Sequence, residues 1–191
     1  MKRIILIIIL AAVVYVAMNF DFFRKNIEYK IKKETGQSVE IPNPREKMQP
    51  NQLLIPALSI ETPVLYAERV DEDHFQELLI EGVVHYPGTA KIGEPGNMYI
   101  FGHSSDNVWA KGNYKTVFAL LPKIKKGDKI IVSDHLGNKF VYEARETKVV
   151  APDDLSVLDQ GQGGKKLLTL QTSYPVGTAL KRFVVIAELI K

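Results

Sequence analysis

The chain has 191 residues and a formal charge of +3, with 46% hydrophobic and 25% charged residues. This length predicts one folded domain with appendages, and the composition is that of an ordinary globular protein. The small net charge, without a basic block interleaved with aromatics, argues against nucleic acid as a partner. The chain contains no cysteine, which excludes disulfide bonds and thiolate metal sites.

The first 23 residues form an apolar segment that we interpret as a membrane anchor. Lys2 and Arg3 precede the unbroken apolar run Ile4–Met18. At about 1.5 Å per residue the run spans roughly 22 Å, short of a ~30 Å hydrocarbon core unless the phenylalanines that follow extend it. A cleaved signal peptide is the alternative, but residues 16–19 (Val-Ala-Met-Asn) make a poor cleavage site. The favoured interpretation is therefore an uncleaved anchor.

Residues 24–50 are polar and then rich in proline, which predicts a stalk or linker. The charges of residues 26–33 are compatible with a helix that continues from the anchor and ends at Gly36. Three prolines between Ile41 and Pro50 disfavour regular structure and suit an extended spacer. We therefore expect the folded domain to cover residues 51–191.

Short apolar and β-branched runs, separated by Pro and Gly turns, predict an all-β domain. The helix expected at Val70–Ile80 has Asp71 as its N-cap, and a helical turn is expected at Lys115–Leu121. The expected strands are 53–60, 63–66, 83–86, 97–103, 128–133, 139–150, 167–172 and 182–189. Many short strands with little helix indicate a barrel or a sandwich.

Polar groups lie where three of these strands begin or end. Thr172 and Ser173 close one strand, Arg182 opens the next, and His103 ends the strand 97–103. Antiparallel pairing of the last two strands would bring Ser173 and Arg182 to one edge of the sheet. A hydroxyl, an imidazole and a guanidinium together are typical of an acyl-transfer site.

These motifs resemble the active-site signature of the sortases, which are cell-surface cysteine transpeptidases. The matching residues are Thr169-Leu170-Gln171-Thr172 on one strand, Arg182 on the next, and the Gly102-His103 step far upstream. The resemblance extends over most of residues 51–191. It implies an all-β fold, a closed eight-stranded barrel with short helices.

The resemblance also implies roles for individual residues. His103 would protonate the departing amine and later deprotonate the incoming one, and Arg182 would orient the substrate and stabilise the oxyanion. Thr172 would hydrogen-bond substrate or backbone. Trp109 and Tyr174 are candidates to line the peptide groove, although aromatic packing in the core or rim is an equal alternative.

By resemblance, the protein acts on surface proteins that carry a Leu-Pro-x-Thr-Gly-type sorting signal. The signal is cut between Thr and Gly, and the acyl part passes to an amine of a cell-wall precursor or a pilin. The domain would face outward from the cell membrane. No second apolar segment follows the Arg182 strand, which favours the housekeeping or class D/E-like groups over the pilin-polymerising ones.

The chain departs from the family at the nucleophile, because Ser173 stands where the family has its cysteine. A serine hydroxyl would need His103 as a true general base. Three interpretations of Ser173 stay open: an introduced Cys→Ser substitution, a natural inactive variant, or a working serine enzyme. The alternative to an impaired transpeptidase is a module of the same fold that binds sorting peptides without turnover.

We expect no obligatory cofactor and assign no metal ligands. Calcium is an alternative, because some sortases bind it and because Asp153, Asp154 and Asp159 cluster in the loop before the signature. The same carboxylates also serve simply to solvate a loop.

Overall fold

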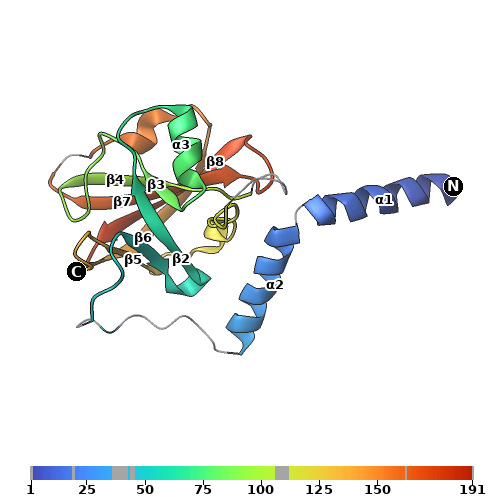
Figure 1. The fold of residues 1–191 in the computed structure, drawn as a ribbon, viewed down its shortest axis with the longest axis horizontal. Helices are drawn as coiled ribbons and strands as arrows, with labels where there is room; N and C mark the ends of the chain where they lie inside the picture. The colour runs from blue at the N-terminus through green and yellow to red at the C-terminus, as the bar shows by residue number, and fades with distance from the viewer. Residues whose placement is uncertain are drawn as a thin grey trace.

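A computed structural model of the chain describes residues 2–18, 20–35, 43, 46–105, 112–161 and 163–190. Its strands close into one barrel in the order β1-β2-β3-β4-β7-β8-β6-β5 (Figure 1). The strands are β1 Gln52–Ile55, β2 Ile60–Tyr66, β3 Val83–His85, β4 Gly96–Phe101, β5 Lys129–Ser133, β6 Lys139–Val150, β7 Lys166–Tyr174 and β8 Lys181–Leu189. The prediction of a closed eight-stranded barrel is confirmed.

Neighbouring strands pair antiparallel, except that β2 pairs parallel with β3 and β4 pairs parallel with β7. The barrel interior is filled by apolar side chains that recur at every second position of a strand, as alternation across a pleated strand requires. On β7 these are Leu168 and Leu170, which are fully buried and pack with Met98 and Ile100 of β4. The same two strands carry the candidate site at their ends.

The predicted strand 53–60 is divided in the structure. β1 ends at Ile55 because Pro56 begins the 3-10 helix η1 (Pro56–Leu58). Ser59 then adopts a positive φ of 51° and donates its N–H to the Pro56 carbonyl at 3.1 Å, which turns the chain into β2. Likewise, the predicted strand 97–103 ends at Phe101, so Gly102 and His103 lie in the loop after β4.

The helix α3 (Glu72–Leu79) is shorter than the predicted Val70–Ile80, but it starts where its cap predicts. The Asp71 carboxylate accepts the N–H of His74 at 2.9 Å, which satisfies a donor that the first turn leaves without a helical partner. Phe75 and Leu79 are buried against the outer wall of the barrel. The other 3-10 helices are η2 (Leu121–Lys123) and η3 (Leu155–Leu158).

Two helices precede the barrel, α1 (Lys2–Met18) and α2 (Phe20–Glu34). Figure 1 shows α2 beside the barrel and α1 leading away from it. Within the described part of the chain, no single helix has both the length and the apolar composition to cross a bilayer. Lys2–Ala17 and Phe20–Glu34 meet those criteria only together, as a pair bent by 72°. The membrane anchor at residues 1–23 stays a prediction.

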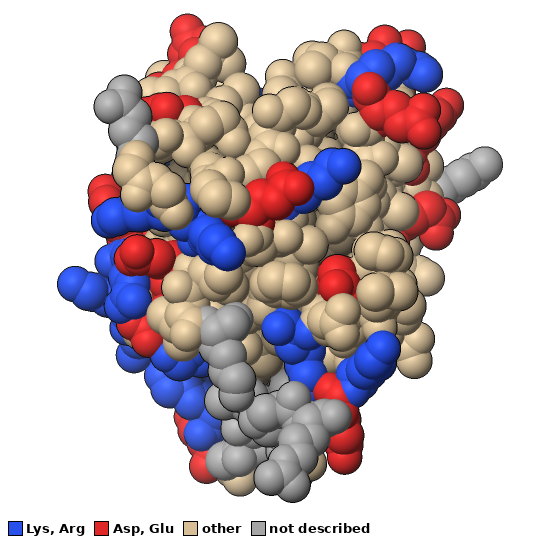
Figure 2. All heavy atoms as spheres, turned by 90° about the vertical axis from the view of Figure 1, so that its left-hand side faces the viewer, with Lys and Arg blue, Asp and Glu red and all other residues tan. Residues whose placement is uncertain are grey.

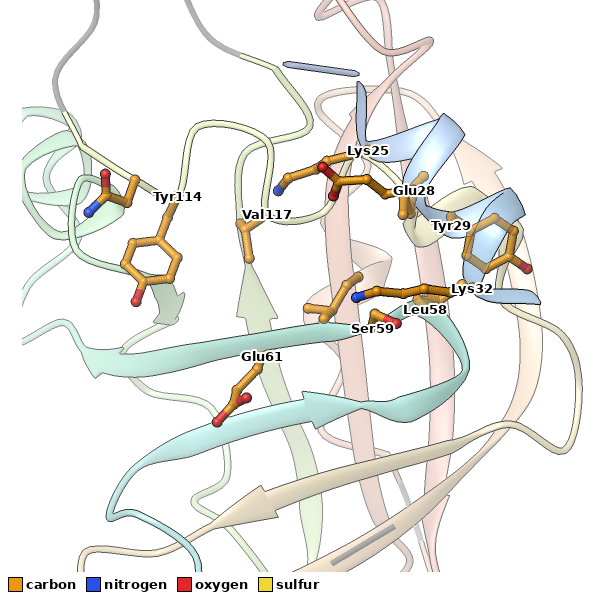
Figure 3. A pocket seen from close by; sticks show the side chains of 12 residues that line it. Lys25, Glu28, Tyr29, Lys32, Leu58, Ser59, Glu61, Tyr114 and Val117 are labelled. Carbon is orange, nitrogen blue, oxygen red and sulfur yellow. The ribbon is translucent and has the colours of Figure 1, made fainter. Parts of the chain in front are cut away.

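The helix α2 contacts the barrel through polar and aromatic groups. The Lys25 ammonium donates to the Thr116 carbonyl at 2.8 Å. Lys123 of η2 lies 4.9 Å from the centre of the Tyr29 ring, and Tyr29 packs against the core of the barrel. An open pocket of about 160 Å³ lies in the seam between the helix and the barrel. The barrel face turned away from the helices mixes both signs of charge among its described residues (Figure 2). Figure 3 shows Lys25, Glu28 and Lys32 extending from α2 into the pocket of the seam.

The chain immediately before Asn51 is hydrogen-bonded to the β5–β6 hairpin. Met48 donates its N–H to the Gly137 carbonyl at 3.1 Å. The fully buried Ser133 hydroxyl donates to the Gln49 carbonyl at 2.6 Å and accepts the Gln52 N–H at 2.9 Å. The last residues of the predicted stalk are therefore tied to the barrel by Ser133.

We expect Ser133→Ala to lower the free energy of unfolding by about 1–3 kcal/mol, because it removes two hydrogen bonds of the buried hydroxyl that are worth about 0.5–1.5 kcal/mol each. Urea denaturation at an unchanged slope is the measurement. Ser156→Ala, at an exposed position of η3, is the matched control and should change stability by less than about 0.5 kcal/mol. Equal midpoints for the two variants would contradict the role given to Ser133.

Candidate active site

Strand register brings the predicted site residues together at one edge of the barrel. Ser173 is the direct antiparallel partner of Arg182 between β7 and β8. β4 runs parallel to β7 with Phe101 opposite Gln171, so the loop that carries His103 begins beside the end of β7. His103, Ser173 and Arg182 all line one cleft of about 490 Å³.

The cleft lies on the outer face of the barrel wall, between α3 and the loop that contains η3. Its polar groups come from both walls, with Glu72 and Gln76 on α3 and Asp154 beside η3. Most of the remaining lining is apolar or aromatic: Phe75, Leu79, Tyr86, Tyr99, Phe101, Pro152, Leu155, Val157 and Leu158. A concave, largely apolar site with a few convergent polar groups is the usual form of a binding site.

Backbone hydrogen bonds hold the His103 segment on both sides. The Gly102 N–H donates to the Gln171 carbonyl at 3.1 Å, and the His103 carbonyl accepts the Phe118 N–H at 2.9 Å. The next residue but one, Ser105, accepts the Gly177 N–H at 3.0 Å from the β7–β8 loop. The loop that carries His103 is thus tied directly to the strand end that carries Ser173.

Gly102 is required by close packing rather than by an unusual φ. A Cβ at this position would lie 2.8 Å from Val83 Cγ1 and 2.9 Å from the Phe118 ring. Such approaches are closer than carbon atoms tolerate, so a larger residue would push the chain away from the barrel wall. The Gly-His step therefore lets His103 follow β4 directly into the cleft.

Thr172 is almost fully buried, and its hydroxyl donates to the Gly102 carbonyl at 2.8 Å. Of the two partners expected for Thr172, substrate or backbone, the structure provides the backbone. Its contact orients the residue before His103, which makes Thr172 a positioning residue in this geometry. Its predicted contact with substrate stays a prediction.

Tyr174 lies on the other face of β7 from Ser173, as the alternation of side chains along a strand requires. Its ring packs on Phe183 with ring centres 5.9 Å apart, against the barrel core. The sequence left two roles open for Tyr174, lining the peptide groove or packing in the core or rim. The structure favours packing. The other candidate, Trp109, lies outside the described residues.

Arg182 is held by the backbone of its own loop. Its Nη1 donates to the carbonyls of Ala179 at 3.1 Å and Lys181 at 3.2 Å. These bonds hold the guanidinium against the β7–β8 loop, and Arg182 lines the same cleft as Ser173. A rigid fork that is always charged suits an anion or a developing oxyanion.

Sequence reasoning did not single out Gln171 and Tyr99, which also line the cleft. The Tyr99 hydroxyl donates to the Gln171 side-chain carbonyl. Burial raises the pKa of Tyr99 far above its ordinary value, and the nearby charge of Arg182 offsets only part of that effect. Tyr99 is therefore a neutral donor. Side chains alternate along a strand, so the sequence places Gln171 on the same face of β7 as Ser173. This alternation was the signal that could have identified Gln171 as a cleft residue.

Two of the three carboxylates considered for calcium, those of Asp154 and Asp159, cap local backbone. The Asp154 carboxylate accepts the Ser156 N–H at 3.0 Å, and the hydrogen bonds from Ser156 lower the pKa of Asp154. Asp159 accepts the Gly161 N–H at 3.1 Å. Among the residues that the structure describes, no group of three or more His, Asp or Glu side chains is placed to hold a metal ion. His85 is buried, with its ring Nε2 at 3.0 Å from the Ala90 carbonyl oxygen and 3.1 Å from the Thr89 hydroxyl, and burial lowers its pKa.

Comparison with known proteins identifies the family. A sortase-domain family model matches residues 53–190, so the chain belongs to the sortase family. Comparison with curated protein sequences gives no match.

Solved sortase structures share the fold. Sortase A from Corynebacterium diphtheriae superposes with a TM-score of 0.61 at 24% identity, over 76% of this chain and 62% of that one. A Clostridium perfringens sortase D5 transpeptidase superposes with a TM-score of 0.60 at 26% sequence identity, over 85% of this chain and 88% of that one. Listeria monocytogenes sortase A superposes with a TM-score of 0.60 at 26% sequence identity, over 73% of this chain and 86% of that one. Because sortases A and D match equally well, the class D/E-like assignment stays a prediction.

We expect Thr172→Val to displace the His103 loop, because the Gly102 carbonyl loses its buried donor. The loss should lower the unfolding free energy by about 1–3 kcal/mol. It should also move the His103 imidazole resonances and their titration in NMR spectra. Thr172→Ser, which keeps the hydroxyl, is the control and should restore the His103 titration. Unchanged His103 signals in Thr172→Val would contradict the positioning role.

Proposed function

We propose that this chain carries a sortase-type transpeptidase site that recognises a Leu-Pro-x-Thr-Gly-type sorting signal. The site is impaired at its nucleophile. The observation that carries the proposal is the pairing of Ser173 with Arg182 at the end of β7, with His103 in the same cleft. The family supplies the reaction class, and the cleft supplies a place for the peptide. The apolar lining suits the Leu and Pro side chains of such a signal.

In the proposed reaction the nucleophile at position 173 passes its proton to His103 and attacks the Thr carbonyl carbon of the peptide. The carbonyl oxygen becomes an oxyanion, which the Arg182 guanidinium stabilises. His103 then gives a proton to the Gly nitrogen as the Thr–Gly bond breaks and the acyl-enzyme forms. An acceptor amine attacks the acyl-enzyme, loses its proton to His103, and frees position 173 as the new amide bond forms.

The serine weakens the first of these steps. A cysteine has an ordinary pKa near 8.5, and a cationic neighbour such as Arg182 favours its thiolate. A serine hydroxyl is far less acidic, so it needs His103 as a strong general base oriented by a third group. The carboxylates that line the cleft have other partners. Glu72 accepts from the Gln76 amide at 2.7 Å, and Asp154 accepts from the Ser156 N–H.

A second candidate function is peptide recognition without turnover. The observation that favours it is the intact cleft, with His103 and Arg182 in place, around a residue that is a poor nucleophile. Truncation or exchange of one nucleophilic atom removes few ground-state contacts, so peptide affinity would survive. The two functions predict different behaviour once a thiol is restored.

The proposed location is the outer face of the cell membrane, with α1 as the anchor. The large apolar side chains of α1 are exposed from Ile4 to Val16, which leaves a long apolar surface for lipid to cover. The proposed partners are surface proteins with a sorting signal and a cell-wall precursor or pilin that supplies the amine. A class D/E-like assignment is part of this proposal.

We expect Ser173→Cys to raise transpeptidation by orders of magnitude, because the site stabilises a thiolate better than it activates an alcohol. A fluorogenic sorting peptide with an added amine acceptor measures turnover, and anisotropy of the labelled peptide measures affinity. Peptide affinity should change much less than turnover. Equal turnover of the Ser173 protein and its Cys variant would make the site a serine transpeptidase. A silent Cys variant that still binds peptide would favour the recognition module.

In the Ser173→Cys background, His103→Ala should lower kcat/KM by about 10²–10⁴-fold, the usual worth of general acid–base catalysis. Arg182→Ala should lower it by about 10²–10³-fold, as loss of an oxyanion donor does. Lys181→Ala, on the exposed neighbour of Arg182, is the matched control and should keep most of the activity. If removal of Arg182 costs no more than removal of Lys181, the oxyanion role is wrong.

A further inference from the structure

The side-chain amide of Gln171 lies among apolar groups on the floor of the cleft. Gln171 precedes Ser173 by two residues on β7, and alternation along the strand puts both side chains on the same face. Its cross-strand partners are Phe101 on β4 and Val184 on β8. Neither of these side chains can pair with an amide. Gln171 is therefore a polar group in apolar surroundings, in line with the nucleophile position.

Tyr99 determines which way this amide faces. The residue is 4% exposed, and its hydroxyl donates to the Gln171 side-chain carbonyl. Burial raises the pKa of Tyr99, so the hydroxyl keeps its proton and remains a donor. Because the carbonyl oxygen of the amide is bound to Tyr99, the NH2 group lies on the other side of the amide. Gln171 thus offers hydrogen-bond donors, and not an acceptor, to the cleft.

Among the residues that the structure describes, the Tyr99 hydroxyl is the one hydrogen-bond partner of the Gln171 side chain. Gln171 is half-buried, so part of the amide is still open to the cleft. A ligand that fills the cleft without an acceptor for the NH2 group would seal these donors away from water unpaired, which costs affinity. A ligand that fits must therefore bring an acceptor to this point.

The spacing along β7 indicates which acceptor a sorting peptide brings. Residues two apart on a strand are separated by about 6.6 Å, and an extended peptide advances by nearly the same distance over two residues. With the Thr carbonyl at position 173 and the Leu and Pro side chains over the apolar lining, the proline carbonyl comes level with Gln171. Proline has no N–H, so its backbone offers only an acceptor. The donors of Gln171 are complementary to that acceptor.

We propose that Gln171 is a specificity-determining residue of the peptide site, whose side-chain N–H donates to the carbonyl oxygen of the proline in the sorting signal. Tyr99 is a positioning residue, because it acts by holding the amide in this orientation. The contact contributes to recognition of the signal and takes no part in making or breaking bonds. The inference rests on the proposed function, which assigns the peptide to this cleft.

A single-atom change in the peptide tests the contact without altering the protein. The probes are a fluorescent Leu-Pro-Ala-Thr-Gly peptide and its analogue with sulfur in place of the proline carbonyl oxygen, since a thioamide sulfur is the weaker acceptor. Anisotropy with the full chain in detergent micelles measures both affinities. The sulfur peptide should bind about three- to tenfold more weakly, the usual worth of one neutral hydrogen bond.

Gln171→Glu removes the N–H donors and keeps an oxygen that accepts from Tyr99. Affinity for the oxygen peptide should fall about tenfold or more, because a carboxylate oxygen then faces the proline carbonyl oxygen. The sulfur peptide should bind this variant no more weakly than the oxygen peptide. Gln52→Glu adds the same charge at the start of β1, outside the cleft lining, and is the matched control. It should keep full affinity for the oxygen peptide.

Tyr99→Phe tests the positioning role. Without the hydroxyl the Gln171 amide can turn either its carbonyl or its NH2 group to the peptide. Affinity for the oxygen peptide should fall less than in Gln171→Glu, and the difference between the oxygen and sulfur peptides should narrow. A merely structural role of Tyr99 would weaken the binding of both peptides equally, which would overturn the positioning role.

A scrambled peptide of the same composition separates this inference from the proposed function. Equal affinity of the unchanged chain for the scrambled and the sorting peptide overturns both. Specific binding of the sorting peptide, with equal affinities for its oxygen and sulfur forms, overturns the role of Gln171 and leaves the proposed function in place. An equal loss on sulfur substitution in the unchanged chain and in Gln171→Glu would be a steric effect of the larger atom, and it would also overturn that role.

Discussion

The hydrogen bond from the buried Thr172 hydroxyl to the Gly102 carbonyl joins the two strands whose ends carry the site. β4 and β7 run parallel here, so both deliver their C-terminal residues to the same edge. The antiparallel partner β8 begins at that edge and places Arg182 directly opposite Ser173. Pairing register therefore places Ser173 opposite Arg182 and starts the loop of His103 beside them. A shift of one residue would turn Ser173 to the wrong face.

The sequence predicted most of this register and little of the packing around it. Alternation and turn residues predicted the strands, and the order of motifs predicted that Ser173 and Arg182 would meet. Alternation along β7 also predicts which way the Tyr174 side chain points, because it places Tyr174 on the inward face together with Thr172. In contrast, the Lys25–Thr116 contact joins residues 91 positions apart and has no local signature. The same holds for the contact of Gly102 with Phe118, which only the closed barrel creates.

A serine in place of the family's cysteine at position 173 changes the chemistry of the nucleophile without changing this architecture. Position 173 is only half-buried, and its partner across the sheet is an arginine held by backbone carbonyls. The determinants of the fold lie on the inward face of β7, where Leu168, Leu170 and Thr172 pack. A barrel with either residue at 173 therefore has the same core. What changes is the acidity of one side chain, and with it the step that forms the acyl-enzyme.

Among the described residues, α2 is held to the barrel by one hydrogen bond, one cation–π contact and the packing of Tyr29 on the core. One hydrogen bond from a charged donor contributes about 1.5–3 kcal/mol, and one exposed cation–π contact about 0.5–1 kcal/mol. The seam also contains an open pocket beside the packed Tyr29. Full burial of a large apolar side chain is worth about 1.5–3 kcal/mol, and Phe20, Ile27 and Ile31 have 60%, 58% and 53% of their surface still exposed. Covering them would therefore contribute a free energy comparable with that of the seam contacts. Through Thr116 and Phe118 it would also bear on the loop that carries His103.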